Sequence, residues 1–161
     1  MWLNPDSIVN SDSHRQKLSD RMIMLQKQGT LRKNYSRGKQ GRREDLNNTF
    51  FRSSWEANYA RYLNYLMLKN IIHYWEYEPD TFWFEEIKRG TRSYLPDFKI
   101  WDTTDSVPYY VEVKGWMDDK SKTKLQRMKK YYPSIRVDIV GAKEYKELHK
   151  KLSGFIDNWE A

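Results

Sequence analysis

The sequence predicts one mixed α/β (α+β) domain with a single central sheet, preceded by a basic N-terminal arm. The 161 residues fit one compact domain with an accessory element. The 7 Trp and 12 Tyr provide enough bulky apolar side chains for a core. Helical and strand-like periodicities also alternate from residue 49 onward. We therefore expect an arm over residues 1–48 and a folded domain over residues 49–161.

The arm is distinguished by its charge. The chain has a net charge of +7, and Ser13–Arg43 carries ten Lys and Arg residues against one Asp, so the remainder is slightly acidic. A helix is expected over residues 13–28, and a loop with two glycines over residues 31–48. A localised basic segment indicates a polyanionic partner, nucleic acid before an anionic membrane surface, and the alternative is a solubilising tail.

The elements of residues 49–161 are expected in the order α, four strands, α, β, α. Aromatic and leucine residues at helical spacing predict the first helix over residues 54–69. Aromatic and β-branched enrichment predicts strands within residues 71–79, 81–87, 91–102, 108–116 and 135–140. Pro96 indicates an interruption or an edge position in its strand. The later helices are expected over residues 120–132 and 142–152.

Several function classes are excluded by composition. The chain has no cysteine, which excludes disulfides, a thiol nucleophile and a Cys-based zinc site. It has no run of 18 apolar residues and its first residues lack a signal-peptide pattern, so we expect a soluble cytoplasmic protein.

Two acids and a lysine lie in segments that otherwise resemble buried strands. In a strand, residues i and i+2 share a face, so Glu112 and Lys114 point one way while Val111 and Val113 point to the core. If the two strands are adjacent, Asp97 comes close to Glu112, and a hard cation such as Mg²⁺ would relieve their repulsion. Lys114 would then orient or deprotonate an attacking water. The alternative is a solvent-facing Glu-x-Lys pair and a turn acid after proline.

The pattern Pro96-Asp97 followed by Glu112-Val113-Lys114 resembles the PD-(D/E)xK nuclease superfamily, and the wider run resembles its phage-encoded members. The resemblance covers residues 49–141 and implies a restriction-endonuclease-like αβββαβ core, with a mixed sheet flanked by helices. It also implies Asp97 and Glu112 as metal ligands, the Val113 carbonyl as a third, and Lys114 as the catalytic lysine. The cofactor would be Mg²⁺, with Mn²⁺ as a substitute. The RecB-like Gln-x-x-x-Tyr signature is not met.

Many members of that superfamily add a glutamate from the first core helix, and Glu56 occupies this place. A competing explanation is a capping box, in which Ser53 caps the helix and Glu56 reaches back to the backbone. Both roles stay open for Glu56.

The arm also resembles a short modular DNA-binding motif of the NUMOD type, found in homing endonucleases, through the run Ser11–Met22. We expect its cations and those of the helix after the lysine to contact DNA phosphates. The candidate DNA-binding residues are Arg15, Lys17, Arg32, Lys33, Arg37, Lys39, Arg42, Arg43, Lys120, Lys122 and Lys124. Trp116 could stack against a base, but packing under the following helix is the favoured expectation.

The function expected from these features is a Mg²⁺-dependent DNA endonuclease acting as a homodimer. A phage-type homing or site-directed enzyme is the first expectation, and a resolvase of Holliday junctions or other branched DNA is the second. The alternatives are a catalytically inactive DNA-binding protein with a nuclease fold, and an RNA-processing nuclease.

Overall fold

A four-stranded mixed sheet forms the centre of the domain. The computed structural model describes residues 39–161, so the expected arm helix lies outside the described residues. The strand order is β3 (Ile72–Tyr77), β6 (Phe98–Asp102), β7 (Tyr109–Val113) and β8 (Val137–Val140). The first three strands run antiparallel, while β7 and β8 run parallel and are linked through a helix. This confirms a mixed α+β domain with one central sheet.

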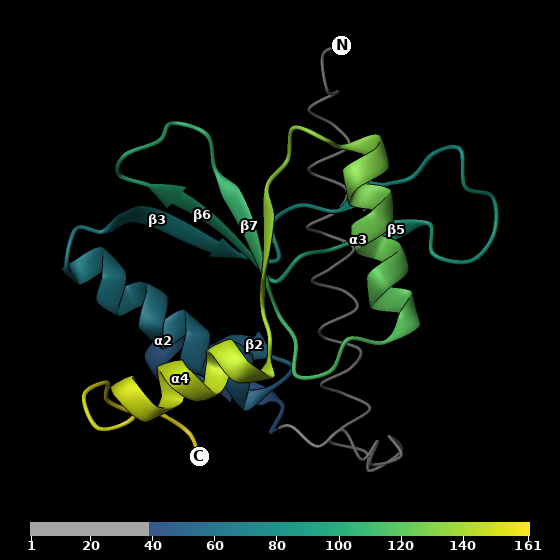
Figure 1. Cartoon of the computed structure of the whole chain (residues 1–161). Helices are drawn as coiled ribbons and strands as arrows, with labels where there is room; N and C mark the ends of the chain where they lie inside the picture. Colours follow the sequence, from purple (N-terminus) through teal and green to yellow (C-terminus); the bar gives the residue numbers. More distant parts are fainter. Residues whose placement is uncertain (1–38) are drawn as a thin grey trace. The chain divides into compact units, whose positions relative to one another are not determined.

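Helices cover both faces of this sheet (Figure 1). On one face, α2 (Ser54–Leu68) and α4 (Ala142–Leu152) pack against buried side chains of β3, β6 and β7, including Phe98, Ile100 and Val111. On the other face, α3 (Asp119–Tyr131) packs on a small hairpin of β4 (Phe82–Trp83) and β5 (Ser93–Tyr94). Residues that alternate along β7 therefore meet two different apolar clusters.

Most expected elements are confirmed, because long periodic segments carry the strongest sequence signal. The three helices lie within one residue of their expected bounds. Pro96 interrupts its strand as expected, and the segment 91–102 divides into β5 and β6. The strands on either side of Pro79 do not pair with each other, because β3 pairs with β6 and β4 pairs with β5.

The expected loop over residues 31–48 is wrong from Gly41 onward. Here β1 (Gly41–Arg43) pairs antiparallel with β2 (Thr49–Phe51), and a short 3-10 helix, η1 (Glu44–Leu46), lies between them. Asn47 and Asn48 close the hairpin with φ of 54° and 57°, a left-handed conformation that asparagine tolerates well. The chain divides between residues 37 and 38, so this hairpin falls in the same unit as the domain.

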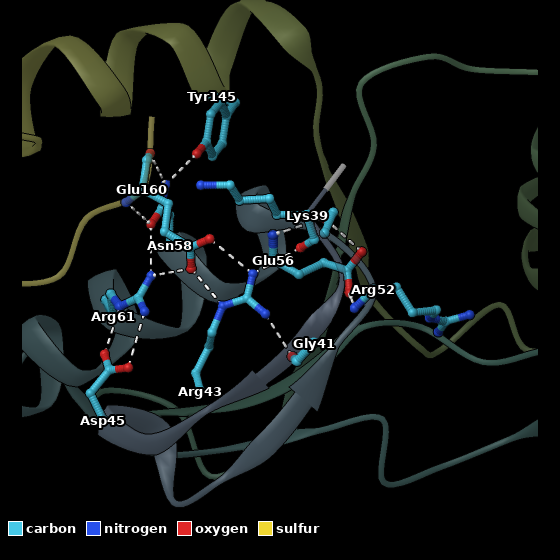
Figure 2. A network of polar contacts seen from close by, with 11 residues as sticks. Lys39, Gly41, Arg43, Asp45, Arg52, Glu56, Asn58, Arg61, Tyr145 and Glu160 are labelled. Carbon is cyan, nitrogen blue, oxygen red and sulfur yellow. Dashed lines mark hydrogen bonds and ion pairs between the residues drawn. The ribbon is translucent and has the colours of Figure 1, made fainter. Parts of the chain in front are cut away.

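A polar network ties the hairpin and the C-terminal residues to α2 (Figure 2). The Arg43 guanidinium donates to Glu160 Oε1 at 2.6 Å and to Oε2 at 2.9 Å. Arg61 of α2 pairs with the same Glu160 and with Asp45 of η1. Fully buried Asn58 donates to the Glu160 carbonyl and accepts from its N–H. The start of α2, where the candidate site begins, is thereby held from two sides.

No helix within residues 39–161 is long and apolar enough to cross a membrane.

Candidate active site

Asp97 lies directly before β6, at the end of the sheet. Phe98 is paired with Val111, and one further step in this antiparallel register brings Asp97 opposite Glu112. The Val113 N–H donates to Asp97 Oδ2 at 2.8 Å, which fixes the carboxylate against the end of β7. The residue is 6% exposed. The expectation that Asp97 and Glu112 come together is therefore met.

Like charges surround the Asp97 carboxylate. Burial raises the pKa of Asp97 well above its ordinary value, and the repulsion of Glu112 and Glu56 raises it further. The Val113 N–H and the Arg52 charge oppose this shift without cancelling it. A buried carboxylate between two acids favours a proton or a cation, so this position is suited to binding positive charge.

Glu112 faces the α3 side of the sheet, as the period-two pattern predicts. Its Oε2 accepts from the Tyr94 hydroxyl at 2.9 Å. Burial raises the pKa of Glu112, while the hydrogen bond from Tyr94 and the charges of Lys114 and Lys124 act in the opposite direction. Val111 and Val113, on the other face, are buried in the α2 cluster.

Lys114 follows β7 directly and is half-buried beside Glu112. Its N–H donates to the Val140 carbonyl at 2.9 Å, which continues the pairing with β8 by one residue. Gly115 then brings the backbone against Trp55 of α2, where an added Cβ would lie 3.2 Å from the indole ring. The close approach holds Lys114 near the first turn of α2.

Glu56 is a cap residue that also belongs to the acidic cluster. Ser53 Oγ accepts from the Glu56 N–H and its hydroxyl donates to the Glu56 carboxylate. The same carboxylate accepts from the Arg52 N–H (Figure 2). This is the reciprocal pattern of a capping box, with one difference. The Glu56 carboxylate accepts from the N–H of Arg52, the residue before the capping Ser53, and not from the N–H of Ser53 itself. The Tyr77 hydroxyl donates to the same carboxylate at 2.6 Å. Since Glu56 also raises the pKa of Asp97, the capping contact does not remove it from the site.

Two contributors to this cluster were missed from the sequence. Arg52, just before α2, forms an ion pair with Glu78. Burial acts to lower the pKa of Arg52, but Tyr77, Asp97 and Glu56 raise it above its ordinary value. Tyr94 reaches Glu112 from a different small sheet. Nothing in their spacing marks either residue, because both contacts depend on how separate elements pack.

The cations of α3 differ in their surroundings. Lys124 lies over the Tyr94 ring at 5.6 Å. Burial lowers its pKa, Glu112 acts to raise it, and the charges of Lys114, Lys120 and Arg52 lower it further. Lys122 is exposed and pairs with Asp119, and Lys120 is exposed at the start of the helix. Lys124 is thus a cation of α3 that acts directly on the acidic cluster, through Glu112.

The remaining candidate DNA-binding residues divide by position. Five lie outside the described residues: Arg15, Lys17, Arg32, Lys33 and Arg37. Lys39 and Arg42 are exposed, and Arg42 also donates to the Asn48 carbonyl. Arg43 pairs with Glu160 and its side chain is 11% exposed, which gives it a structural role; its predicted phosphate contact stays a prediction.

Trp116 is 80% exposed, so its expected packing under the following helix is wrong. Asp118 begins α3, its Oδ1 accepting from the Ser121 N–H at 2.7 Å, and the short connection from β7 leaves the indole at the surface.

The donor set suits a hard divalent cation held largely by water. Within residues 39–161, no three or more His, Asp or Glu side chains are placed to ligate one metal ion. Mg²⁺ needs only one or two carboxylates, together with waters and substrate oxygens. Asp97 and Glu112 supply two carboxylates, and a cation would relieve the repulsion that raises the pKa of Asp97.

No protein-family model, curated protein or solved structure matches this chain, so its function is inferred from the site.

Proposed function

We propose that this chain is a metal-dependent DNA endonuclease with a core of the PD-(D/E)xK type. The observation that carries the proposal is the meeting of Asp97, Glu112 and Lys114 at one end of the sheet, where the two carboxylates repel each other in a buried setting. The order α2, β3, β6, β7, α3, β8 also agrees with the αβββαβ core of that superfamily.

Asp97, Glu112 and the Val113 carbonyl are the proposed ligands of Mg²⁺, for which Mn²⁺ would substitute. When bound, such a cation supplies Lewis-acid stabilisation of a phosphate oxygen and lowers the pKa of a coordinated water. Lys114, next to Glu112, orients or deprotonates the attacking water. Arg52 and Lys124 offset negative charge on the phosphate, since both carry their charge beside the two carboxylates. Glu56 keeps α2 in place and adds negative charge beside Asp97.

A non-catalytic DNA-binding protein is the rival from another class. Such a protein would gain nothing from a carboxylate held at 6% exposure against two other acids, because this arrangement costs stability unless a cation compensates it. The buried acidic pair therefore favours the enzyme.

Among endonucleases, a phage-type homing or site-directed enzyme is the first candidate, on account of the basic segment of residues 13–43, and a branched-DNA resolvase is the second. We propose a homodimer for either, since cutting both strands requires two sites.

The test is cleavage of linear duplex, a four-way junction and genomic DNA in Mg²⁺ or Mn²⁺. The wild type should cut at least one of them, with ends at one locus indicating homing and symmetric cuts at the branch indicating a resolvase. Asp97→Ala should abolish cleavage while DNA binding remains, and Asp105→Ala, in an exposed turn, should behave as wild type. Binding by the wild type without cleavage of any form would refute the enzyme and leave the DNA-binding rival.

A further inference from the structure

Trp116 is a large aromatic side chain without a place in either core. It is 80% exposed, and it takes part in no ring pair found among residues 39–161. Burying an indole typically stabilises a fold by a few kcal/mol, so exposing one forgoes that gain. An exposed Trp next to an active site is therefore a candidate contact for a ligand.

The connection that carries Trp116 is short and fixed at both ends. Lys114 is paired to Val140 of β8, and Asp118 caps α3. Between them, Met117 lines a narrow crevice together with Glu112, Tyr94 and Lys124. Trp116 is two residues from Lys114, so their Cα atoms are at most about 7 Å apart. The backbone that carries the exposed indole therefore lies within about 7 Å of the backbone of Lys114 in the proposed cleavage site.

Several cations lie beside the crevice that Met117 lines. Lys124 also lines this crevice, and the charges of Lys114, Lys120 and Arg52 all act on Lys124. Cations interleaved with an exposed aromatic ring are typical of surfaces that track a phosphate backbone while a base stacks on the ring.

We propose that Trp116 stacks on an unpaired base beside the cleaved phosphate, so that the enzyme acts on DNA containing a branch, flap or single-stranded segment. In continuous duplex both faces of every base are covered by its neighbours, and an indole has no base face to contact. An unpaired base already exposes its face, so the indole can stack on it without the energy that unstacking a paired base requires. This inference rests on the proposed nuclease function and specifies the substrate of the same site. The exposed Trp116 favours the branched-DNA enzyme over the homing enzyme, which the basic segment alone had placed first.

The experiment compares two DNAs of equal length, one fully paired and one carrying an unpaired 2-aminopurine at a branch. Binding is measured without divalent metal for the wild type, Trp116→Ala, Trp116→Phe and the control Trp83→Ala. Trp83 is another exposed tryptophan, at 57%, but it lies in β4, where its carbonyl accepts from Tyr132 at the far end of α3. Cleavage of the same DNAs is then measured in Mg²⁺.

The wild type should bind the branched DNA more tightly and quench the 2-aminopurine fluorescence. Trp116→Ala should lower the affinity for branched DNA by roughly tenfold to a hundredfold and abolish the quenching. Trp116→Phe should keep most of both, and Trp83→Ala should resemble the wild type.

The proposal is overturned if the wild type shows no preference, if Trp116→Ala keeps the preference, or if Trp83→Ala loses it equally. Equal cleavage of both DNAs would refute stacking and leave the nuclease intact. Tryptophan-dependent binding without cleavage of any DNA would refute the nuclease and leave the stacking contact. A wild type that binds neither DNA would refute both.

Discussion

Asp97 is the residue on which the proposed chemistry depends most. Its carboxylate is buried, receives one backbone N–H and stands between Glu56 and Glu112. The charges do not enter the core, because Phe98 and Val111 fill the α2 side while the acids gather at the end of the sheet. A position this unfavourable for an isolated anion would be compensated by the cation that we propose for this site.

The raised pKa of Asp97 predicts a pH-dependent cost in stability. The folded state favours the protonated form of Asp97. The contribution of this group to stability is therefore greatest below its unfolded pKa of about 3.9 and is lost as pH rises through its raised pKa in the folded state. Without divalent metal, Asp97→Asn should therefore melt at a higher temperature than the wild type at pH 7, and this gain should shrink towards about pH 4.

Thermal melts in buffer with a chelator measure this, with Asp105→Ala as the control. Added Mg²⁺ should raise the melting temperature of the wild type more than that of Asp97→Asn. A lower melting temperature for Asp97→Asn at pH 7 would contradict the claim that the ionised Asp97 carboxylate destabilises the fold when no metal is bound.

At this scale the sequence reveals part of the site. Period-two alternation identifies Glu112 and Lys114 as sharing a face, and the Pro–Asp step marks Asp97. Tyr94 and Arg52 could not be identified, since their contacts with Glu112 and Asp97 arise only when β5 and the start of α2 meet the end of the sheet.

Among the elements, the hairpin of β1 and β2 is the addition that matters most to the site. It lies against α2 through the Arg43–Glu160–Arg61 network, whose side chains are 11%, 18% and 5% exposed. Glu160 compensates both cations, so the C-terminal residues help to hold the helix that carries Glu56.

Glu160→Ala should lower the free energy of unfolding by about 3 kcal/mol, because it removes the carboxylate that pairs with the largely buried Arg43 and one of the two carboxylates that pair with Arg61. Urea unfolding measures the loss. Glu86→Ala, at an exposed position, should stay within about 0.5 kcal/mol of wild type. Equal stability of the two variants would show that the network contributes nothing.

The helices were predictable and this hairpin was not. Leucine and aromatic spacing identifies α2, and Leu125 and Met128 identify the inner face of α3. The two strands of the hairpin have three residues each, which is too short for a period-two signal, and β1 is polar. The partner of Arg43 lies 117 residues away, a distance that no local pattern spans.

At the scale of the whole molecule, the chain divides between residues 37 and 38, and not after residue 48 as expected for the arm. This boundary determines which residues can be deleted without removing part of the folded domain. An arm ending at residue 48 would include β1 and η1, which are part of the folded unit of residues 38–161. Removal of residues 1–37 spares them.

Deleting residues 1–37 should weaken DNA binding and flatten its salt dependence. The slope of log K against log salt should fall by about 0.9 for each DNA phosphate that the shortened chain no longer neutralises. Replacing Arg32, Lys33 and Arg37 with Gln in the full chain should give a smaller change of the same kind. Binding titrations over a range of salt measure both, and circular dichroism checks the fold. Unchanged affinity in both variants would show that the basic segment does not contribute to DNA binding and is a solubilising tail.

The central claim is that Asp97, Glu112 and Lys114 form a metal-dependent phosphodiester-cleaving site. The most direct measurement is single-turnover cleavage of a bound DNA in Mg²⁺ by the wild type, Lys114→Ala and the control Lys146→Ala, at an exposed position of α4. Lys114→Ala should slow cleavage by about 10²- to 10⁴-fold, as for loss of a proton-transferring group, while DNA binding stays comparable and Lys146→Ala cuts as the wild type does. Equal rates for Lys114→Ala and wild type, or a wild type that binds DNA and never cuts it, would contradict the claim.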